Sequence, residues 1–319
     1  MRILVTGATG FVGRHLCQAL VEAGHIVSAA VRRSPDPALP AEINVVNVGE
    51  IGPDTDWRHM TDGMDAVVHL AARTHVMEET HADPEAEYQR INVEATRRLA
   101  LGAARSGVGR FVFLSSIKVN GEQTAAHPFS AGDTPAPEDA YGRTKRDAEA
   151  ELVRATEGTQ TETAILRAPL VYGPGVKGNF QKLLEAVDQG KWLPLGSIDN
   201  RRSMVYVGNL VSALMAALTS ELAAGGTFLV SDGEDVSVTN LLQGIGAALD
   251  RPVKLVPVPV TVLKVIGILS GKSAAIKRLA GSLQVDQSDL HDQLGWSPPF
   301  SMKEGLEQTA QWFKDRSSQ

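Results

Sequence analysis

The sequence of 319 residues is poor in cysteine, in aromatic side chains and in long apolar runs. Its one cysteine, Cys17, excludes an internal disulfide and a zinc site of several thiolates. Aromatic residues make up 5% of the chain, which leaves little for an aromatic-lined apolar pocket. The longest late apolar stretch, Val260–Leu269, is far shorter than the ~20 residues that span a bilayer. We interpret it as an amphipathic helix packed on its own domain, with membrane contact or a dimer face as alternatives.

The chain also lacks an excess of positive charge. Its 37 Asp and Glu residues outnumber 31 Lys and Arg residues, and the net charge is -6. Nucleic acid and membrane surfaces are therefore not expected partners. Gly7 and Gly10 interrupt the apolar N-terminal run, and no basic start or small-residue cleavage site accompanies it. We expect no signal peptide, no stable membrane insertion and a cytoplasmic location.

Glycine, by contrast, is abundant, with 30 residues, as in chains whose backbone comes close to a bound phosphate. Short apolar runs alternate with stretches of helical periodicity. The expected strands are 2–6, 26–31, 44–48, 66–70, 110–115 and 163–167, and the expected helices include 11–23, 84–106 and 141–152. This alternation predicts an α/β fold, a Rossmann-type doubly wound parallel sheet with helices on both faces.

The rhythm changes after Pro169, where glycine and proline become frequent and short helices dominate. Strands expected at 204–207 and 227–231 indicate that the chain returns to the sheet. We expect a dinucleotide-binding domain of residues 1–170 plus about 204–233. A smaller, discontinuous α/β domain takes residues 171–203 and 234–319, over the sheet edge where such folds bind ligands.

Three glycines follow the first expected strand and open the first expected helix. Gly7 permits a tight turn, Gly10 lets the backbone approach a pyrophosphate, and Gly13 allows close helix–strand packing. The second strand ends in Arg32 and Arg33 rather than in a carboxylate, which favours a 2′-phosphate and therefore NADP(H), with NAD(H) as the alternative. Glu50 is an expected contact for the adenine amino group or a surface carboxylate.

Tyr141 and Lys145 lie four residues apart and so share one face of a helix. An adjacent ammonium favours the phenolate, and we expect it to lower the tyrosine pKa toward neutrality. Ser116 ends the fifth strand at the same sheet edge, where its hydroxyl can bond the same substrate oxygen. These three residues predict a catalytic hydride-transfer site. No histidines and carboxylates show metal-ligand spacing, so no metal is expected.

Motifs along nearly the whole chain resemble the extended short-chain dehydrogenase/reductase family of the NAD-dependent epimerase/dehydratase type. They are residues 6–13 (Thr-Gly-Ala-Thr-Gly-Phe-Val-Gly), 69–72 (His-Leu-Ala-Ala), 92–93 (Asn-Val), 113–116 (Phe-Leu-Ser-Ser) with 121–122 (Gly-Glu), Tyr141 with Lys145, 166–167 (Leu-Arg) with 171–175 (Val-Tyr-Gly-Pro-Gly), 202–207 (Arg-Ser-Met-Val-Tyr-Val) and 294–298 (Leu-Gly-Trp-Ser-Pro).

The resemblance implies a UDP-sugar substrate held by the smaller domain, and a possible homodimer through a four-helix bundle of residues 84–106 and 141–152. It implies the catalytic roles of Ser116, Tyr141 and Lys145, Lys145 also holding the nicotinamide ribose. The implied cofactor contacts are Gly7, Thr9, Gly10, Phe11, Val12, Gly13, Arg32, Arg33, Glu50, Ile51, Leu70, Ala71, Ala72, Asn92, Ser115, Tyr141, Lys145, Pro169 and Val171. The implied substrate contacts are Arg73, His75, Lys118, Val119, Asn179 and Arg202, although Asn179 as a helix cap and Lys118 as a solvated lysine are alternatives.

Departures from the family pattern guide the choice of reaction. Ile117 and Lys118 stand where dehydratases carry Asp-Glu, so dehydration is not expected. The runs 71–77 and 115–122 resemble bacterial reductases of UDP-4-keto-6-deoxy-N-acetylhexosamines, which make UDP-N-acetylquinovosamine or UDP-N-acetylfucosamine for surface polysaccharide such as O-antigen. We expect an NAD(P)H-dependent C4 reductase with Tyr141 as proton donor. The alternatives are a UDP-hexose or UDP-N-acetylhexosamine 4-epimerase with bound NAD, and a non-catalytic cofactor-binding regulator.

Overall fold

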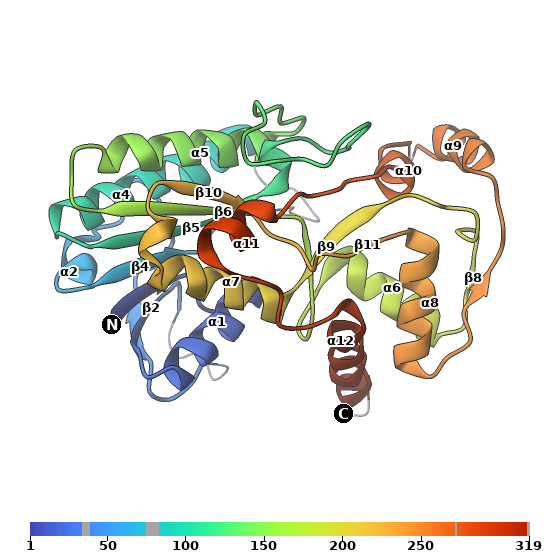
Figure 1. Ribbon diagram of the computed structural model, residues 1–319, viewed down its shortest axis with the longest axis horizontal. Coiled ribbons are helices and arrows are strands. Elements are labelled where there is room, and N and C mark those ends of the chain that lie inside the picture. Colours follow the sequence, from blue (N-terminus) through green and yellow to red (C-terminus); the bar gives the residue numbers. More distant parts are fainter. Residues whose placement is uncertain (34–38, 75–82, 272, 318–319) are drawn as a thin grey trace.

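The computed structural model describes residues 1–33, 39–74, 83–271 and 273–317, and the expected doubly wound parallel sheet is confirmed (Figure 1). Seven strands are ordered β10-β6-β5-β4-β1-β2-β3, and every neighbouring pair is parallel. The strands are β1 (Arg2–Thr6), β2 (Ile26–Val31), β3 (Asn44–Asn47), β4 (Ala66–His69), β5 (Arg110–Ser116), β6 (Glu162–Ala168) and β10 (Gly226–Leu229). The central residues of β1, β2, β4, β5 and β6 are almost fully buried, as expected for a sheet covered on both faces, whereas the edge strand β3 is only partly buried.

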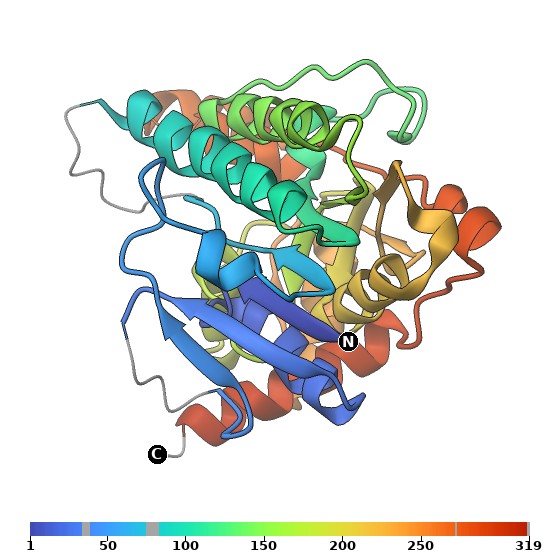
Figure 2. The same cartoon turned by 90° about the vertical axis from the view of Figure 1, so that its left-hand side faces the viewer.

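Helices cover both faces of this sheet, as Figures 1 and 2 show. One face carries α1 (Phe11–Glu22), α7 (Val207–Thr219) and α11 (Ser288–Leu294), with η3 (Glu221–Ala223) at its edge. The other carries α2 (Arg58–Thr61), α4 (Ala95–Arg105) and α5 (Ala140–Thr156). The expected helix over 84–106 is composite, because α3 (Pro84–Tyr88) and a π-helical segment, η1 (Gln89–Glu94), precede α4. A 3₁₀ turn, η2 (Ile117–Val119), follows β5.

The smaller domain lies beside the sheet's carboxyl edge and has its own core (Figure 1). A three-stranded sheet orders β11 (Asp235–Val236), β9 (Arg202–Tyr206) and β7 (Leu170–Tyr172), and a second sheet pairs β12 (Lys254–Leu255) with β8 (Trp192–Leu193). Its helices are α6 (Gly178–Asp188), α8 (Val238–Leu249), α9 (Val260–Leu269), α10 (Ser273–Ala280) and α12 (Met302–Ser317).

Two segments differ from the expected division of the chain. The strand expected at 204–207 is β9, which pairs with β7 and β11 rather than with the main sheet. Leu290 of α11 and Trp296 pack into the core between the main sheet and α1 and α7. We therefore propose that β9 belongs to the smaller domain and residues 288–296 to the Rossmann domain.

Candidate functional site

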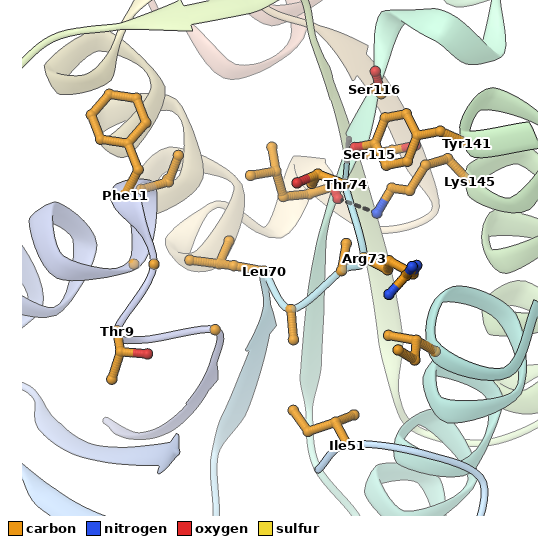
Figure 3. Close-up of a pocket in the computed structure, with 18 of the residues that line it drawn as sticks. Thr9, Phe11, Ile51, Leu70, Arg73, Thr74, Ser115, Ser116, Tyr141 and Lys145 are labelled. Carbon is orange, nitrogen blue, oxygen red and sulfur yellow. Dashed lines mark hydrogen bonds between the residues drawn. The ribbon is translucent and has the colours of Figure 1, made fainter. Parts of the chain in front are cut away.

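A cavity of about 830 Å³ lies at the carboxyl edge of the sheet, where the loops after β1, β2, β4, β5 and β6 meet. In Figure 3, Thr9 and Phe11 stand on one side of it, and Ser116, Tyr141 and Lys145 stand on the other. Of the predicted cofactor contacts, all except Arg33 and Asn92 line it. The cavity also takes in Thr74, Glu87, Arg90 and Ile91, which the sequence analysis did not single out.

The glycine loop forms one wall. Gly7 has a φ of +71° and its carbonyl accepts a hydrogen bond of 2.9 Å from the Gly10 N–H, which closes the turn. A Cβ at Gly13 would lie 2.1 Å from the Gly7 oxygen, so only glycine permits this packing. No side chain caps α1 at Gly10, and the first residues of the helix line the cavity. This arrangement fits a diphosphate.

Arg32, Arg33 and Glu50 lie at the far end, in a shallower hollow of about 350 Å³ that they line with Thr9. All three side chains are exposed. The Glu50 carboxylate lies 4.0 Å from the Arg90 guanidinium. The arginines therefore stand where the second strand ends, as expected, and their preference for a 2′-phosphate stays a prediction.

Asn92, an expected cofactor contact, does not line the cavity and is enclosed in the structure. Its side chain is 1% exposed, and its amide oxygen accepts a 2.7 Å bond from the Arg73 N–H. Its amide nitrogen donates to the Arg73 carbonyl at 3.0 Å and to the Thr144 hydroxyl at 3.1 Å. Asn92 thus ties the cavity-lining loop after β4 to α5, from a π-helical segment that turns its side chain inward.

Ser116, Tyr141 and Lys145 meet as predicted. Ser116 ends β5, and its side chain is hydrogen-bonded to Tyr141. Tyr141 stands in the first turn of α5, whose cap Asp139 accepts a 2.7 Å bond from the Gly142 N–H. The Lys145 ammonium donates to the Leu114 carbonyl at 2.7 Å and lies 3.8 Å from the centre of the Phe113 ring. A phenol, a hydroxyl and an ammonium thus border one cavity and can handle a proton on a substrate oxygen.

The expected electrostatics of this trio are wrong in direction. Burial raises the pKa of Tyr141 to about 12, although the hydrogen bond from Ser116 opposes the shift. Burial also lowers the pKa of Lys145 to about 7, against the attraction of Glu149. The lysine therefore carries only a partial charge near neutrality, and its ammonium is directed to Leu114. The phenol keeps its proton in this arrangement.

A buried polar network behind Lys145 escaped the sequence analysis. Glu149 and Arg167 are 7% and 6% exposed and form a two-pronged ion pair of 3.0 and 2.6 Å. Ser115 donates to the same carboxylate, and Arg167 also donates to the Asn120 amide oxygen at 3.0 Å. One feature of the sequence could have indicated Glu149: Tyr141, Lys145 and Glu149 follow one another at four-residue intervals, which places them on one face of a helix.

The predicted substrate contacts differ in whether they reach the cavity. Arg73 lines the cavity, with its guanidinium 5.4 Å from the centre of the Tyr88 ring. Val119 is corrected, because its 0% exposure rules out direct contact in this conformation. The Lys118 ammonium is paired with Glu122 at 2.9 Å and with Asp139, which places it as a brace of the loop before Tyr141.

Two further predicted contacts, Asn179 and Arg202, lie outside the cavity. Asn179 is exposed in the first turn of α6, and Lys177 rather than Asn179 is the residue at its cap. Arg202 is half-buried on β9, and its guanidinium donates to the carbonyls of Arg278 and Gly281 at 2.8 and 3.0 Å. His75 lies outside the described residues.

The described part of the chain holds neither a candidate metal site nor a candidate membrane span. No three His, Cys, Asp or Glu side chains gather there as metal ligands would. Likewise, none of the described helices has the length and apolar character needed to cross a membrane.

Several known proteins are similar to this chain over most of its length. It is 45% identical over 316 residues, 98% of this chain and 95% of the relative, to a UDP-glucose 4-epimerase of Vibrio cholerae. It is 26% identical, over 97% of this chain and 94% of the relative, to an N-acetyl-α-D-glucosaminyl-diphospho-ditrans,octacis-undecaprenol 4-epimerase of Escherichia coli O157:H7. The solved structure of MoeE5 with UDP-glucose and NAD matches with a TM-score of 0.79 and 28% identity, over 100% of both chains.

The family model described as "NAD dependent epimerase/dehydratase family" matches residues 3–231. The match spans all seven strands of the main sheet and the residues of the Ser116–Tyr141–Lys145 trio. The chain therefore belongs to the NAD dependent epimerase/dehydratase family.

Proposed function

We propose that this protein is a 4-epimerase of a UDP-linked hexose or N-acetylhexosamine that works with NAD. The observation that carries the proposal is the 45% identity, over 98% of the chain, to a UDP-glucose 4-epimerase. The cavity supports it, because a glycine loop suited to a diphosphate faces a phenol, a hydroxyl and an ammonium. The relative that acts on a diphospho-undecaprenol sugar supports a sugar diphosphate as the recognised group.

The fit of a dinucleotide is argued from the cavity itself. The backbone at Gly7, Gly10 and Gly13 would hold the diphosphate, and Leu70, Ala71 and Ala72 would border the rings. Bound NAD supplies reversible acceptance of the hydride from the sugar C4. MoeE5 was solved with NAD, and we propose NAD rather than NADP(H) as the working cofactor. Arg32 and Arg33 are the residues by which NADP(H) would bind.

The chain's own residues move the proton. Tyr141 acts in its deprotonated form: the phenolate oxygen takes the proton of the C4 hydroxyl and, as the phenol, returns it to the C4 oxygen after the sugar has presented its other face. Ser116 is already bonded to that phenol and holds the same substrate oxygen. The Lys145 ammonium places a positive charge beside the Tyr141 oxygen, and the carboxylate of Glu149 favours this charged form of the lysine. We propose Arg202 as the contact for the UDP diphosphate, where a guanidinium fork suits phosphate.

The C4 reductase is the second candidate, favoured by residues 119–121 (Val-Asn-Gly) and by Pro169 and Leu170, where epimerases usually carry Val-Tyr-Gly and an asparagine. One experiment separates the two. Purified protein is given UDP-glucose or UDP-N-acetylglucosamine, and proton NMR follows the C4 epimer while absorbance at the nicotinamide band follows the cofactor. An epimerase converts either sugar with no net cofactor use. Stoichiometric loss of NADH or NADPH with a UDP-4-keto-6-deoxy sugar, and no conversion of UDP-glucose or UDP-N-acetylglucosamine, would establish the reductase instead.

The choice of dinucleotide has its own test. The Arg32→Ala/Arg33→Ala variant should bind NADP⁺ about tenfold more weakly and NAD⁺ unchanged, because each guanidinium can pair with a 2′-phosphate that NAD⁺ lacks. Calorimetric titration of both dinucleotides measures this. Equal losses for the two would remove the arginines from the recognition of the 2′ position.

We also propose a homodimer through α4 and α5. The two helices lie side by side on the outer face of the sheet (Figures 1 and 2). Val153 of α5 is 50% exposed there. Light scattering should give twice the 34.0 kDa chain mass, and a single-chain mass at micromolar concentration would refute it.

A further inference from the structure

Helix α9 presents an apolar surface outward. Among its residues only Leu263 and Gly267 are buried, and Leu263 enters the core of the smaller domain. The exposed fractions on the other side reach 70% for Ile268 and 83% for Leu269. We call this side the α9 surface; its members are Val262, Val265, Ile266, Ile268 and Leu269. Scattered exposed apolar residues are ordinary, but five on one ten-residue helix form a patch.

The stretch of sequence that contains α9 is basic, in a chain whose net charge is -6. Between Arg251 and Val285 the sequence has no Asp or Glu. Its basic residues are Arg251, Lys254, Lys264, Lys272, Lys277 and Arg278. Arg251 and Lys277 pair with acidic residues from outside the segment, Asp188 at 3.3 Å and Glu138 at 3.5 Å. Lys264 and Arg278 are exposed and make no ion pair with another described residue.

We propose that the α9 surface docks on an anionic lipid bilayer. Apolar side chains of a short helix can enter the boundary between headgroups and acyl chains, while flanking lysines and arginines meet lipid phosphates. A second copy of this chain fits less well, because a symmetric contact through α9 would bring two basic segments together. The overall negative charge would have argued against a membrane, but the charge is unevenly distributed along the chain. The proposal goes beyond the epimerase reaction and does not depend on which sugar is turned over.

The docking segment is bonded to residues outside the cavity, one of which lies on the loop that leads to Tyr141. Helix α10 packs on α9, and a Cβ at Gly267 would lie 2.8 Å from Ile276. The carbonyls of Lys277 and Arg278 accept hydrogen bonds from Gln123 at 2.9 Å and Arg202 at 2.8 Å. The Glu138 partner of Lys277 lies three residues before Tyr141. Docking would therefore connect the membrane contact to the loop that precedes Tyr141.

Vesicle flotation with the full chain tests the proposal. The probes are vesicles of 70% phosphatidylcholine with 30% phosphatidylglycerol, and vesicles of phosphatidylcholine alone. The Ile268→Asp/Leu269→Asp variant should lose about tenfold or more of its partition to the anionic vesicles, because two apolar side chains no longer enter the bilayer. Lys264→Glu should weaken it by about fivefold, since one attraction to the anionic surface becomes a repulsion. The matched control is Ile26→Asp/Leu222→Asp, at side chains 65% and 70% exposed elsewhere, which should partition as the unchanged protein does.

Several outcomes would overturn the proposal. One is equal partition of the α9 variant and the unchanged protein, and another is no partition of the unchanged protein. A third is a halved mass of the α9 variant in light scattering without vesicle binding by either protein, which would assign the surface to a second copy. Circular dichroism and turnover of soluble UDP-glucose in the α9 variant check its fold. Because that turnover is measured without vesicles, failure of docking and failure of the epimerase proposal are separate results.

Discussion

Lys145 and Lys264 are lysines on two helices with opposite surroundings. Lys145 is 2% exposed on α5, donates to a backbone carbonyl and has its pKa lowered to about 7 by burial. Lys264 is exposed on α9 among apolar side chains that face outward. The pKa of a buried lysine depends strongly on the groups next to it. An exposed lysine keeps its charge in solvent, where the charge can attract the surface of another molecule. In the Rossmann domain, burial shifts the pKa of a lysine at the site. At the outer end of the smaller domain, a lysine and apolar side chains are exposed and can contact a partner.

The largest expected effect concerns the buried site of the Rossmann domain, which contains Lys145. Tyr141→Phe removes the phenol oxygen that carries the proton, and turnover of UDP-glucose should fall by about 10²- to 10⁴-fold. The control is Tyr206→Phe in the smaller domain, whose hydroxyl bonds Gln308 at 2.6 Å and should matter little for the rate. Steady-state kinetics measures both. Unchanged turnover by Tyr141→Phe would remove the tyrosine from the mechanism.

Glu149→Gln should give the next largest effect, on stability. It leaves the buried Arg167 guanidinium without its charged partner, and the free energy of unfolding should fall by about 3–5 kcal/mol. Glu151→Gln breaks an ion pair with the mostly exposed Arg154 and should cost less than about 1 kcal/mol. Denaturant titration compares the two variants.

The same variant sharpens the role of Lys145. Removing the Glu149 charge lowers the lysine pKa further, so the ammonium persists only at lower pH. The alkaline limb of the pH–rate profile should therefore move to lower pH in Glu149→Gln and stay in place in Glu151→Gln. A limb that stays in place in both would make Glu149 purely structural.

His69 predicts a pH-dependent stability of the sheet. Its ring is fully buried, bonds Thr6 and Thr96 at 2.6 and 2.9 Å, and has its pKa lowered to about 3 by burial. Below the unfolded value of 6.5 only the unfolded chain takes up this proton, so stability should fall by about 1.4 kcal/mol per pH unit between pH 6.5 and 3. Thermal unfolding of the protein and of His69→Gln measures this term as a difference in slope. Parallel curves for the two would contradict it.

The smallest expected effect concerns the smaller domain. Arg202→Ala should raise KM for UDP-glucose about tenfold with little change in kcat, because a diphosphate contact binds substrate and transition state alike. Arg201→Ala, the exposed neighbour, serves as the control. A loss confined to kcat would instead place Arg202 near the reacting carbon.

The cofactor side of the site was largely predictable. Parallel strands end at one sheet edge, so the residues after β1, β4 and β5 had to converge, and a four-residue spacing placed Tyr141 and Lys145 on one helix face. The glycine loop was equally local, because Gly7, Gly10 and Gly13 act through backbone geometry within one turn.

Contacts between distant segments were not predictable in the same way. Asn92 was assigned to the cofactor, yet its side chain closes on the Arg73 backbone nineteen residues earlier. Glu149 meets Arg167 only because β6 runs alongside β5 beneath α5. The expected reductase rested on short runs of residues, whereas the proposed epimerase rests on a similarity that extends over 98% of the chain.

The sequence by itself determined the order of strands and helices, the diphosphate loop and the trio of Ser116, Tyr141 and Lys145, because these depend on local periodicity and on backbone freedom at glycine. Only the tertiary structure decided which charges are buried, that Val119 is enclosed while Leu269 is exposed, and that the apolar side chains of α9 face outward. Burial depends on what packs against a residue from far along the chain, and it is burial that sets both the pKa values at the site and the surface left for a partner.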